Sequence, residues 1–143
     1  KQLSGFEFKR SIAAERINHF DDLSEILRNG RLSEGNKLSL EGYRKLQKKL
    51  EIVKFEIEKK LENFDCFITP SAPGEALKNL KFTGSPIFNT AWTLTGMPAI
   101  TLPLFKGSNN LPIGLQFICN KGQDLKLFNT SKLILKFLNQ NEK

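Results

Sequence analysis

The chain has 143 residues, of which 39% are hydrophobic and twelve are Phe, so it is long enough for one domain with a real core and does not resemble a disordered chain. No apolar run approaches the roughly 18–20 residues of a membrane-spanning helix, so we expect no membrane partner. The net charge of +7 invites a nucleic-acid-binding hypothesis, but glutamates alternate with the lysines and no phosphate-binding motif accompanies them. We therefore expect a solvated, salt-bridged surface whose binding to nucleic acid is weak and falls steeply with salt.

The first part of the chain has the apolar spacing of helices. Residues 6–27 follow this pattern, with a break predicted at residues 20–22, where an Asp is suited to cap a second short helix. Gly30 and Gly35 predict a loop after it.

One long amphipathic helix is predicted next. Apolar residues recur every three or four positions from Leu40 to Phe64, and Ser39 stands where an N-cap belongs. Glu41 lies four residues before Lys45, the spacing of a helical ion pair. The pattern indicates a helix of roughly 24 residues.

The period changes after Asp65, where short apolar runs predict strands. The first run reads as a buried strand that enters a long loop, and the next two are joined by K-G-S-N-N, which favours an antiparallel hairpin. Asp124 is suited to cap a final helix. The three strands are predicted at residues 66–69, 99–104 and 113–119.

A further helix is predicted between Ser85-Pro86, which suits a helix start, and Gly96, which suits its end. One side of this helix, with Ile87, Ala91 and Leu94, is expected to face the core. The adjoining side joins two aromatic surfaces to an amide, the kind of lining that small-molecule pockets have, although a core role is the alternative. This second side consists of Phe88, Asn89 and Trp92.

The cysteines and the histidine limit the possible metal and redox chemistry. Cys66 and Cys119 each lie in an apolar run, so we expect reduced core thiols in a cytoplasmic protein, with one disulfide as the alternative. His19 is the only histidine, and no Cys/His spacing suits zinc. We expect no metal and no cofactor.

Three motifs in order resemble the C-terminal part of the amidase-signature enzymes. They are F-D-C-F-I-T-P-S-A-P-G at residues 64–74, T-G-S-P-I-F-N-T-A-W-T-L-T-G-M-P-A-I-T-L-P at residues 83–103, and L-P-I-G-L-Q-F-I at residues 111–118. The long helix with its L-S-L-E-G-Y start and the closing helix are also similar to the family. The likeness covers about residues 10–140.

The resemblance implies an α/β fold, a mixed sheet flanked by helices, of which this chain holds an incomplete C-terminal part. The chain is then the C-terminal segment of a single amidase domain (1–143), with a helical part (5–63), a strand and pocket part (64–119) and a closing helix (123–140). Family members hydrolyse amides with a Ser–Ser–Lys triad in a Gly/Ser-rich segment well upstream of these motifs. This chain has no Gly-Gly and no Ser-Ser, so we expect it to contain no catalytic residue.

The resemblance also implies a substrate-binding set in this chain: Thr83, Gly84, Phe88, Asn89 and Trp92. Members of the family often have Asp after Thr-Gly, where this chain has Ser85, so the resemblance does not specify which amide is the substrate. The expected function is the C-terminal portion of an amide hydrolase that acts on a small amide and needs the N-terminal part of the same enzyme. The amidase subunit of a tRNA-dependent amidotransferase and a basic, non-enzymatic binding module are the alternatives, and a homodimer stays open.

Overall fold

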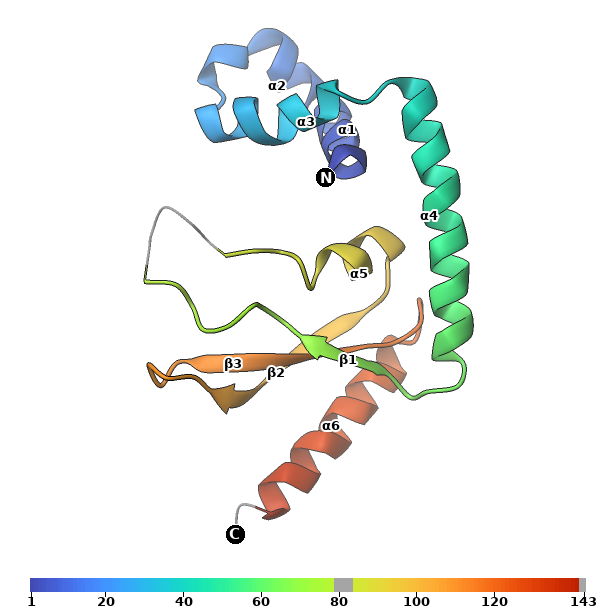
Figure 1. Cartoon of the computed structure of the whole chain (residues 1–143), viewed down its shortest axis with the longest axis vertical. Helices are drawn as coiled ribbons and strands as arrows, with labels where there is room; N and C mark the ends of the chain where they lie inside the picture. Colours follow the sequence, from blue (N-terminus) through green and yellow to red (C-terminus); the bar gives the residue numbers. More distant parts are fainter. Residues whose placement is uncertain (79–83, 142–143) are drawn as a thin grey trace. The chain divides into compact units, whose positions relative to one another are not determined.

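The computed structural model describes residues 1–78 and 84–141. The chain divides into two compact units, Lys1–Val53 and Lys54–Lys143, and Figure 1 labels their α-helices and strands. Within the described residues, no helix is long and apolar enough to cross a membrane.

The first unit is built from short helices. The helical pattern of residues 6–27 is confirmed, and so is its break, which is a 3₁₀ turn. The predicted Asp cap is wrong: Leu23 is extended, and the Oγ of Ser24 accepts from the N–H of Leu27 at 3.4 Å instead. The elements are α1 (Gln2–Ser11), α2 (Ala13–Asn18), η1 (Phe20–Asp22), the π-helix η2 (Leu27–Leu32) and α3 (Ser33–Asn36).

Gly30 and Gly35 do not form the predicted loop, since Gly30 lies in η2 and Gly35 in α3. Gly35 faces Gly5 of α1, and both are buried. A Cβ added at Gly5 would stand 2.8 Å from the backbone nitrogen of Gly35, and one added at Gly35 would clash with the Gly5 carbonyl. Gly35 therefore allows the backbones of α1 and α3 to touch. The residues next to Gly35 in the sequence do not indicate this contact.

The long helix α4 (Leu40–Leu61) is confirmed, with 22 residues. The N–H of Gly42 donates to Ser39 Oγ at 3.1 Å, which confirms the N-cap. Lys45 Nζ lies 2.7 Å from a carboxylate oxygen of Glu41, which confirms that ion pair. In the first unit, the ring of Tyr43 stacks on Phe6 with 4.4 Å between centroids.

The second unit holds a three-stranded sheet of β1 (Phe67–Pro70), β2 (Ala99–Lys106) and β3 (Pro112–Ile118) in the order β1-β3-β2. Both pairs are antiparallel, so the predicted hairpin of β2 and β3 is confirmed.

Two details of the sheet differ from a regular ladder. β1 is an edge strand with alternating exposure rather than a buried strand, because it has one neighbour; Ile68 is 55% exposed. The ladder of β2 shifts register between Leu102 and Phe105, around Pro103, which has no N–H to donate.

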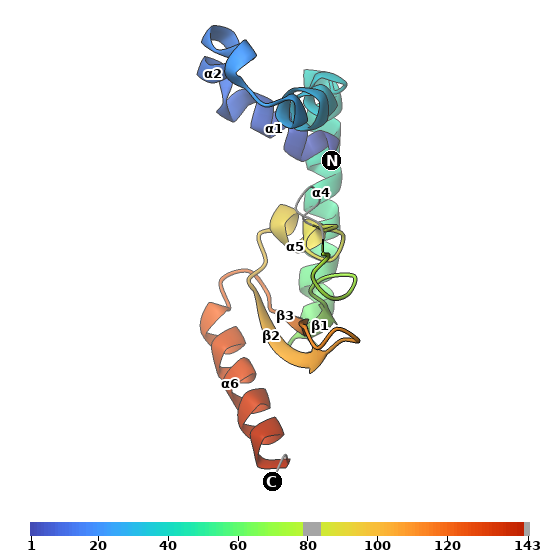
Figure 2. The ribbon, with the colours of Figure 1, turned by 90° about the vertical axis from the view of Figure 1, so that its left-hand side faces the viewer.

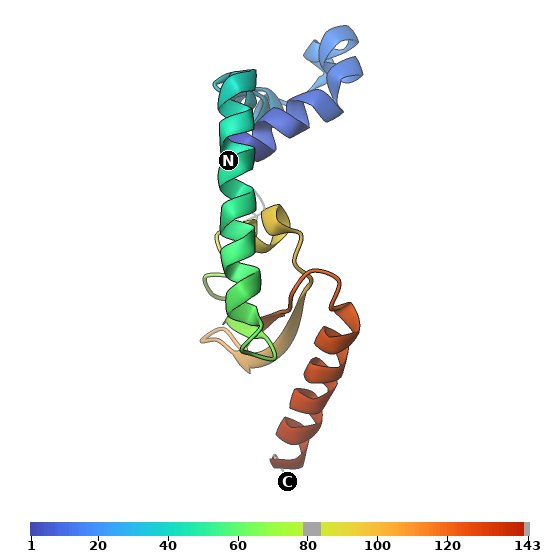
Figure 3. The ribbon, with the colours of Figure 1, turned by 90° about the vertical axis from the view of Figure 1, so that its right-hand side faces the viewer.

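The two faces of the sheet pack against different helices. On one face, Phe117 and Cys119 of the third strand region form a buried cluster with Leu127 of α6 (Asp124–Asn141). On the other, Ile118 packs with Leu61 at the end of α4. Figures 2 and 3 show α6 and the end of α4 on opposite sides of the sheet.

The predicted combination of helices and a sheet is therefore observed, with a small antiparallel sheet. Strand pairing within residues 1–78 and 84–141 is antiparallel only, so the mixed sheet is not formed by the described part of the chain. The final helix is confirmed and begins at Asp124 itself, whose carboxylate lies in the first turn, where the helix dipole favours negative charge.

Glu75 closes the turn between β2 and β3. Its carboxylate accepts from the backbone N–H of Asn109 at 3.0 Å, from Asn109 Nδ2 at 2.6 Å and from the N–H of Leu111 at 3.1 Å. Burial raises the pKa of Glu75, but these hydrogen bonds outweigh it, and the pKa lies below the usual 4.5.

We predict that Gly35→Ala lowers the free energy of unfolding by about 1–3 kcal/mol, because the new methyl group overpacks the contact with Gly5. Gly30→Ala is the matched control: a Cβ there meets nothing within 4 Å, and Ala should raise helix stability by up to about 1 kcal/mol. Urea unfolding followed by far-UV circular dichroism measures both. Equal effects of the two variants would contradict the helix contact.

We predict that the stability difference between the protein and Glu75→Gln depends on pH. A carboxylate whose pKa is lowered on folding stabilises the protein fully above its unfolded pKa, near 4.5, and this contribution disappears as pH falls through the folded pKa. Urea unfolding from about pH 7 to about pH 2.5 tests this, with Glu62→Gln as the control for loss of one charge. A difference for Glu75→Gln that stays constant over this range refutes the role of the carboxylate.

Candidate functional site

Four polar groups form a hydrogen-bonded chain between the sheet and the turn before α5 (Thr90–Thr95). Thr69 Oγ1 donates to Gln116 Oε1 at 3.3 Å, and Gln116 Nε2 donates to Asn89 Oδ1 at 2.7 Å. Asn89 Nδ2 then donates to the backbone carbonyl of Ser71 at 3.1 Å. We call these four residues the amide network.

The orientation of both amides follows from the two ends of this chain. A main-chain carbonyl can only accept, so the group of Asn89 that faces Ser71 must be its NH₂. The Oδ1 of Asn89 then accepts from Gln116, whose own oxygen is left for Thr69. The side chain of Gln116 is buried, at 5% exposure, and the network satisfies a polar group that would be costly without partners.

Ser71 is itself fixed on β3. Both its N–H and its Oγ donate to the carbonyl of Gly114, at 3.1 and 3.0 Å. A Cβ at Gly114 would lie 2.5 Å from that Oγ, so a side chain at position 114 would displace Ser71. The glycine therefore supports the place at which Asn89 is held.

The segment before α5 starts differently from the prediction. The carbonyl of Pro86 accepts from the N–H groups of Asn89 and Thr90, both at 3.0 Å, which makes a turn, and the helix begins only at Thr90. Ser85 precedes the turn instead of capping a helix, and the side chain of Asn89 makes no cap either, because the amide network uses it. The predicted helix end is confirmed: Gly96 has a φ of +69°.

The side of this segment that packs on the core was predicted wrongly. Ile87 is 66% exposed and Ala91 is exposed, while Leu94 is half-buried. Trp92 packs instead against the buried cluster that contains Met97. Its Nε1 is buried and has no hydrogen-bond partner among the residues that the structure describes.

The predicted binding residues are placed as follows. Asn89 and Trp92 lie one helical turn apart, and both contact the face of the sheet that carries Gln116. Phe88 is half-buried, and Gly84 has a φ of +97°, a conformation that favours glycine. Thr83 lies outside the described residues. Contact of these residues with a substrate stays a prediction.

The described residues of the amide network do not include the nucleophile and base that catalysis requires. A nucleophilic serine needs a base, and the hydroxyl of Ser71 donates to a main-chain carbonyl. Among the described residues, no three His, Cys, Asp or Glu side chains are grouped to hold a metal ion. A hollow of about 230 Å³ is lined by Phe55, Glu58 and Lys59 of α4 and by Glu62 just after it, and not by the amide network.

Gln116 was missed by the sequence reasoning. The alternation of Ile113, Leu115 and Phe117 marks one face of the strand, and a polar residue between them reads as exposed. The available signal was its place two residues after Gly114 in the third motif, on the same face of the strand as that glycine.

Comparison with known protein families gives one clear match. The family model described as Amidase matches residues 8–128. A glutamyl-tRNA(Gln) amidotransferase subunit from Sulfurimonas denitrificans is 32% identical over 105 residues, which are 69% of this chain and 24% of that protein. The corresponding subunit from Aliarcobacter butzleri is 35% identical over 103 residues, 68% of this chain and 23% of that protein. The chain thus spans about a quarter of the length of these relatives.

Two solved structures have a similar fold over about a third of their own length. A crystal structure of an amidase has a TM-score of 0.72 at 24% identity, over 87% of this chain and 31% of that one. A glutamyl-tRNA(Gln) amidotransferase subunit of Thermotoga maritima has a TM-score of 0.53 at 25% identity, over 88% and 31%.

We predict that Asn89→Ala lowers the free energy of unfolding by about 1–3 kcal/mol, because it removes the acceptor of the buried Nε2 of Gln116 and the donor to the carbonyl of Ser71. Asn29→Ala, at an exposed amide, is the control and should change stability by less than about 0.5 kcal/mol. Urea unfolding of both variants measures the difference. If the two losses are equal, the amide network does not stabilise the unit.

Proposed function

Because the chain belongs to the amidase family, we propose that it is the C-terminal portion of an amide-bond hydrolase of the Ser–Ser–Lys type. In this proposal the chain forms part of the wall of a substrate pocket, and the catalytic triad lies in a part of the protein outside this chain. The observation that carries the proposal is the family match over residues 8–128, which includes the three strands and α5.

The proposed pocket wall is the segment with Phe88, Asn89 and Trp92, preceded by Thr83 and Gly84. Two half-buried aromatic rings beside an amide suit a small molecule with both apolar and polar parts. Gln116 and Ser71 already hold the amide of Asn89 in one orientation, so a substrate would meet a polar group that loses little freedom on binding. The Nε1–H of Trp92 is buried and has no partner among the described residues, so it would donate to an amide oxygen only if the side chain turned toward the substrate.

The chemistry itself is assigned to residues outside this chain. Hydrolysis through an acyl-enzyme needs a nucleophile, a base and oxyanion donors within hydrogen-bond reach. The nine serines of this chain include no Ser-Ser pair, and no Gly-Gly stands near any of them. The role that we propose for the chain is therefore to bind and orient the amide, with attack and proton transfer performed by the triad.

The exposed apolar side chains of the second unit fit an incomplete domain. Large apolar exposures usually mark surfaces that another element covers. We propose that the remainder of the amidase domain covers them. They include Leu125, Phe128, Leu133 and Phe137 on α6, Ile68 on β1 and Phe105 on β2, each exposed by more than half.

The amidase subunit of a tRNA-dependent amidotransferase is the second candidate. Its support is the identity of 32% and 35% to the two glutamyl-tRNA(Gln) amidotransferase subunits described above. In that case the amide would be that of glutamine, and the enzyme would need a docking face for a partner subunit.

We predict that the chain alone hydrolyses no amide, whereas the protein encoded with the reading frame upstream of Lys1 does. That frame should contain a Gly-Gly-Ser-Ser stretch with a lysine some tens of residues before it, and its absence would refute the enzymatic proposal. Ammonia release from a neutral aliphatic amide without any partner favours the amidase. Ammonia release from glutamine that requires a partner subunit favours the amidotransferase.

The same complete protein tests the pocket wall. Asn89→Ala should lower kcat/KM by the equivalent of about 1–3 kcal/mol. Trp92→Phe keeps an aromatic ring on the core and removes the N–H, so it should raise KM or lower kcat with little loss of stability. Ile87→Ala, at an exposed position of the same turn, is the control. If Asn89→Ala and Trp92→Phe lose thermal stability and keep the full kcat/KM, these residues are structural and the pocket assignment is wrong.

A further inference from the structure

The two cysteines are far apart in sequence but meet at one end of the sheet. Phe67 of β1 pairs with Ile118 of β3 in an antiparallel register. Cys66 directly precedes the first and Cys119 directly follows the second, so continuing the register by one step places the two cysteines opposite each other.

Both thiols point to the same face of the sheet. Side chains alternate along a strand, so Cys119 shares a face with Phe117, and Cys66 shares a face with Ile68, which pairs with Phe117. Cys119 belongs to the buried cluster on that face, and Cys66 packs against the same cluster.

The hydrogen-bond phase of the two strands favours a short distance between the cysteines. The N–H of Ser71 donates to the carbonyl of Gly114, which makes that pair a hydrogen-bonded one. Hydrogen-bonded and non-hydrogen-bonded pairs alternate along an antiparallel ladder. The pair Cys66/Cys119 lies five steps from Ser71/Gly114, so it is a non-hydrogen-bonded pair. The N–H of Cys119 accordingly donates to Pro98, away from β1. Cα atoms in such pairs are about 4.5 Å apart, within the range of about 4.4–6.8 Å of disulfides.

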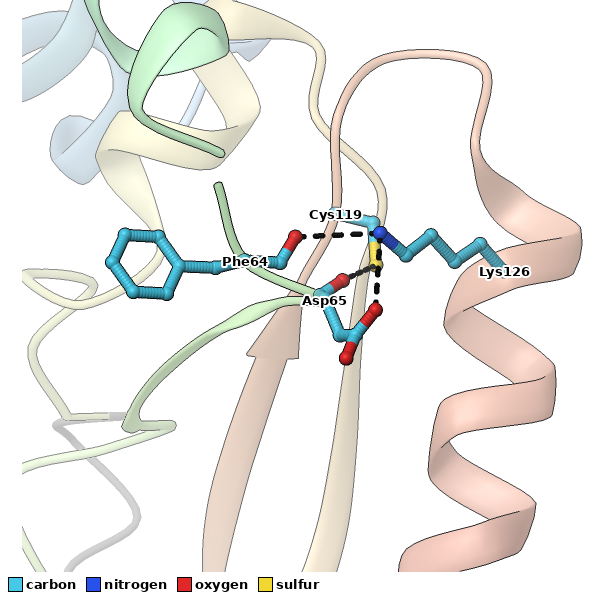
Figure 4. A network of polar contacts seen from close by, with 4 residues as sticks. All are labelled: Phe64, Asp65, Cys119 and Lys126. Carbon is cyan, nitrogen blue, oxygen red and sulfur yellow. Dashed lines mark hydrogen bonds and ion pairs between the residues drawn. The ribbon is translucent and has the colours of Figure 1, made fainter. Parts of the chain in front are cut away.

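The surroundings of the pair hold this end of the sheet together. Cys119 Sγ donates to the carbonyl of Asp65 at 3.3 Å, and Lys126 Nζ lies 3.4 Å from Asp65 Oδ1 and 3.3 Å from the carbonyl of Phe64 (Figure 4). Cys119 has no exposed surface and Cys66 is half-buried. Burial raises the pKa of both thiols. An oxidant in solution therefore reaches Cys66 first.

We propose that Cys66 and Cys119 are a redox pair, free thiols in this structure, that closes to a disulfide between β1 and β3 on exchange with a small disulfide such as oxidised glutathione. The thiolate of Cys66 attacks one sulfur of glutathione disulfide, which forms a mixed disulfide and releases one glutathione. Cys119 then attacks the sulfur of Cys66 as its thiolate, and the proton of Cys119 passes to the departing glutathione thiolate, so the second glutathione is released as a thiol. The bond ties the edge strand β1 covalently to β3.

The experiment equilibrates the purified 143-residue chain with reduced and oxidised glutathione, traps free thiols by alkylation and identifies the linked peptides by mass spectrometry. The same mixture in concentrated guanidinium chloride gives the unfolded reference. We expect the ratio of Cys66–Cys119 disulfide to dithiol to be at least about tenfold higher in native buffer, because the fold presents the two sulfurs to each other. The oxidised chain should also melt at a higher temperature than the reduced chain.

Two variants separate the steps. Cys119→Ala should stop at a mixed disulfide of glutathione with Cys66, and in Cys66→Ala the buried Cys119 should stay a free thiol in native buffer. The proposal is overturned if the ratio of disulfide to dithiol is no higher in native buffer than in guanidinium chloride. This holds also where the chain is unfolded in both solutions. Accumulation of the Cys66 mixed disulfide in the unsubstituted chain overturns it as well.

Discussion

β3 is bonded on both edges and packed on both faces, and the arrangement of the second unit depends on it. β1 and β2 hydrogen-bond to β3 and not to each other. Phe117 and Ile118 are consecutive residues with 1% and 0% exposure, and they enter different clusters, one with α6 and one with the end of α4. Burial of each contributes about 1.5–3 kcal/mol. A strand that supports both faces in this way leaves little tolerance for a change of register, since a slip of one residue would exchange its two faces.

The buried amide of Gln116 adds direction to this framework. Apolar packing alone would let the segment before α5 settle at several positions on the sheet, whereas a buried amide requires particular partners. Asn89 supplies the acceptor, and it is in turn held by the carbonyl of Ser71. Trp92 follows on the next helical turn, so its ring is placed by a polar contact made three residues earlier. The position of the proposed pocket wall thus depends on one residue in the middle of β3.

Features with local causes could be predicted from the sequence. The long helix, its Ser39 cap and the Gly96 stop follow from period and backbone conformation, and each is confirmed. The errors concern contacts between distant residues. The sequence around Gly35 is typical of a loop, and only the contact with Gly5 shows why a glycine is needed in this helix. The core-facing side of the α5 segment is determined by the packing of Trp92 on the cluster that contains Ile118.

The candidate site shows the same limit. The sequence suggested Asn89, but its partner Gln116 lies 27 residues away and falls on the strand face that alternation assigned to solvent. The reach of these residues toward a substrate depends on groups outside the chain, so no pattern within it could decide that point.

The register shift at Pro103 also governs how the sheet can grow. β2 is an edge strand, and its outer backbone groups are a template for any further strand. A partner joining from outside can follow a regular ladder along Ala99–Leu102, but beyond this point it meets a residue without an N–H and a change of pleat. Extension of the sheet on this side is therefore limited to the first half of β2, and two copies of the chain cannot stack edge to edge along its whole length. A short, correctly phased strand is accepted at the end of β2 nearest α5, and longer, unspecific pairing is discouraged.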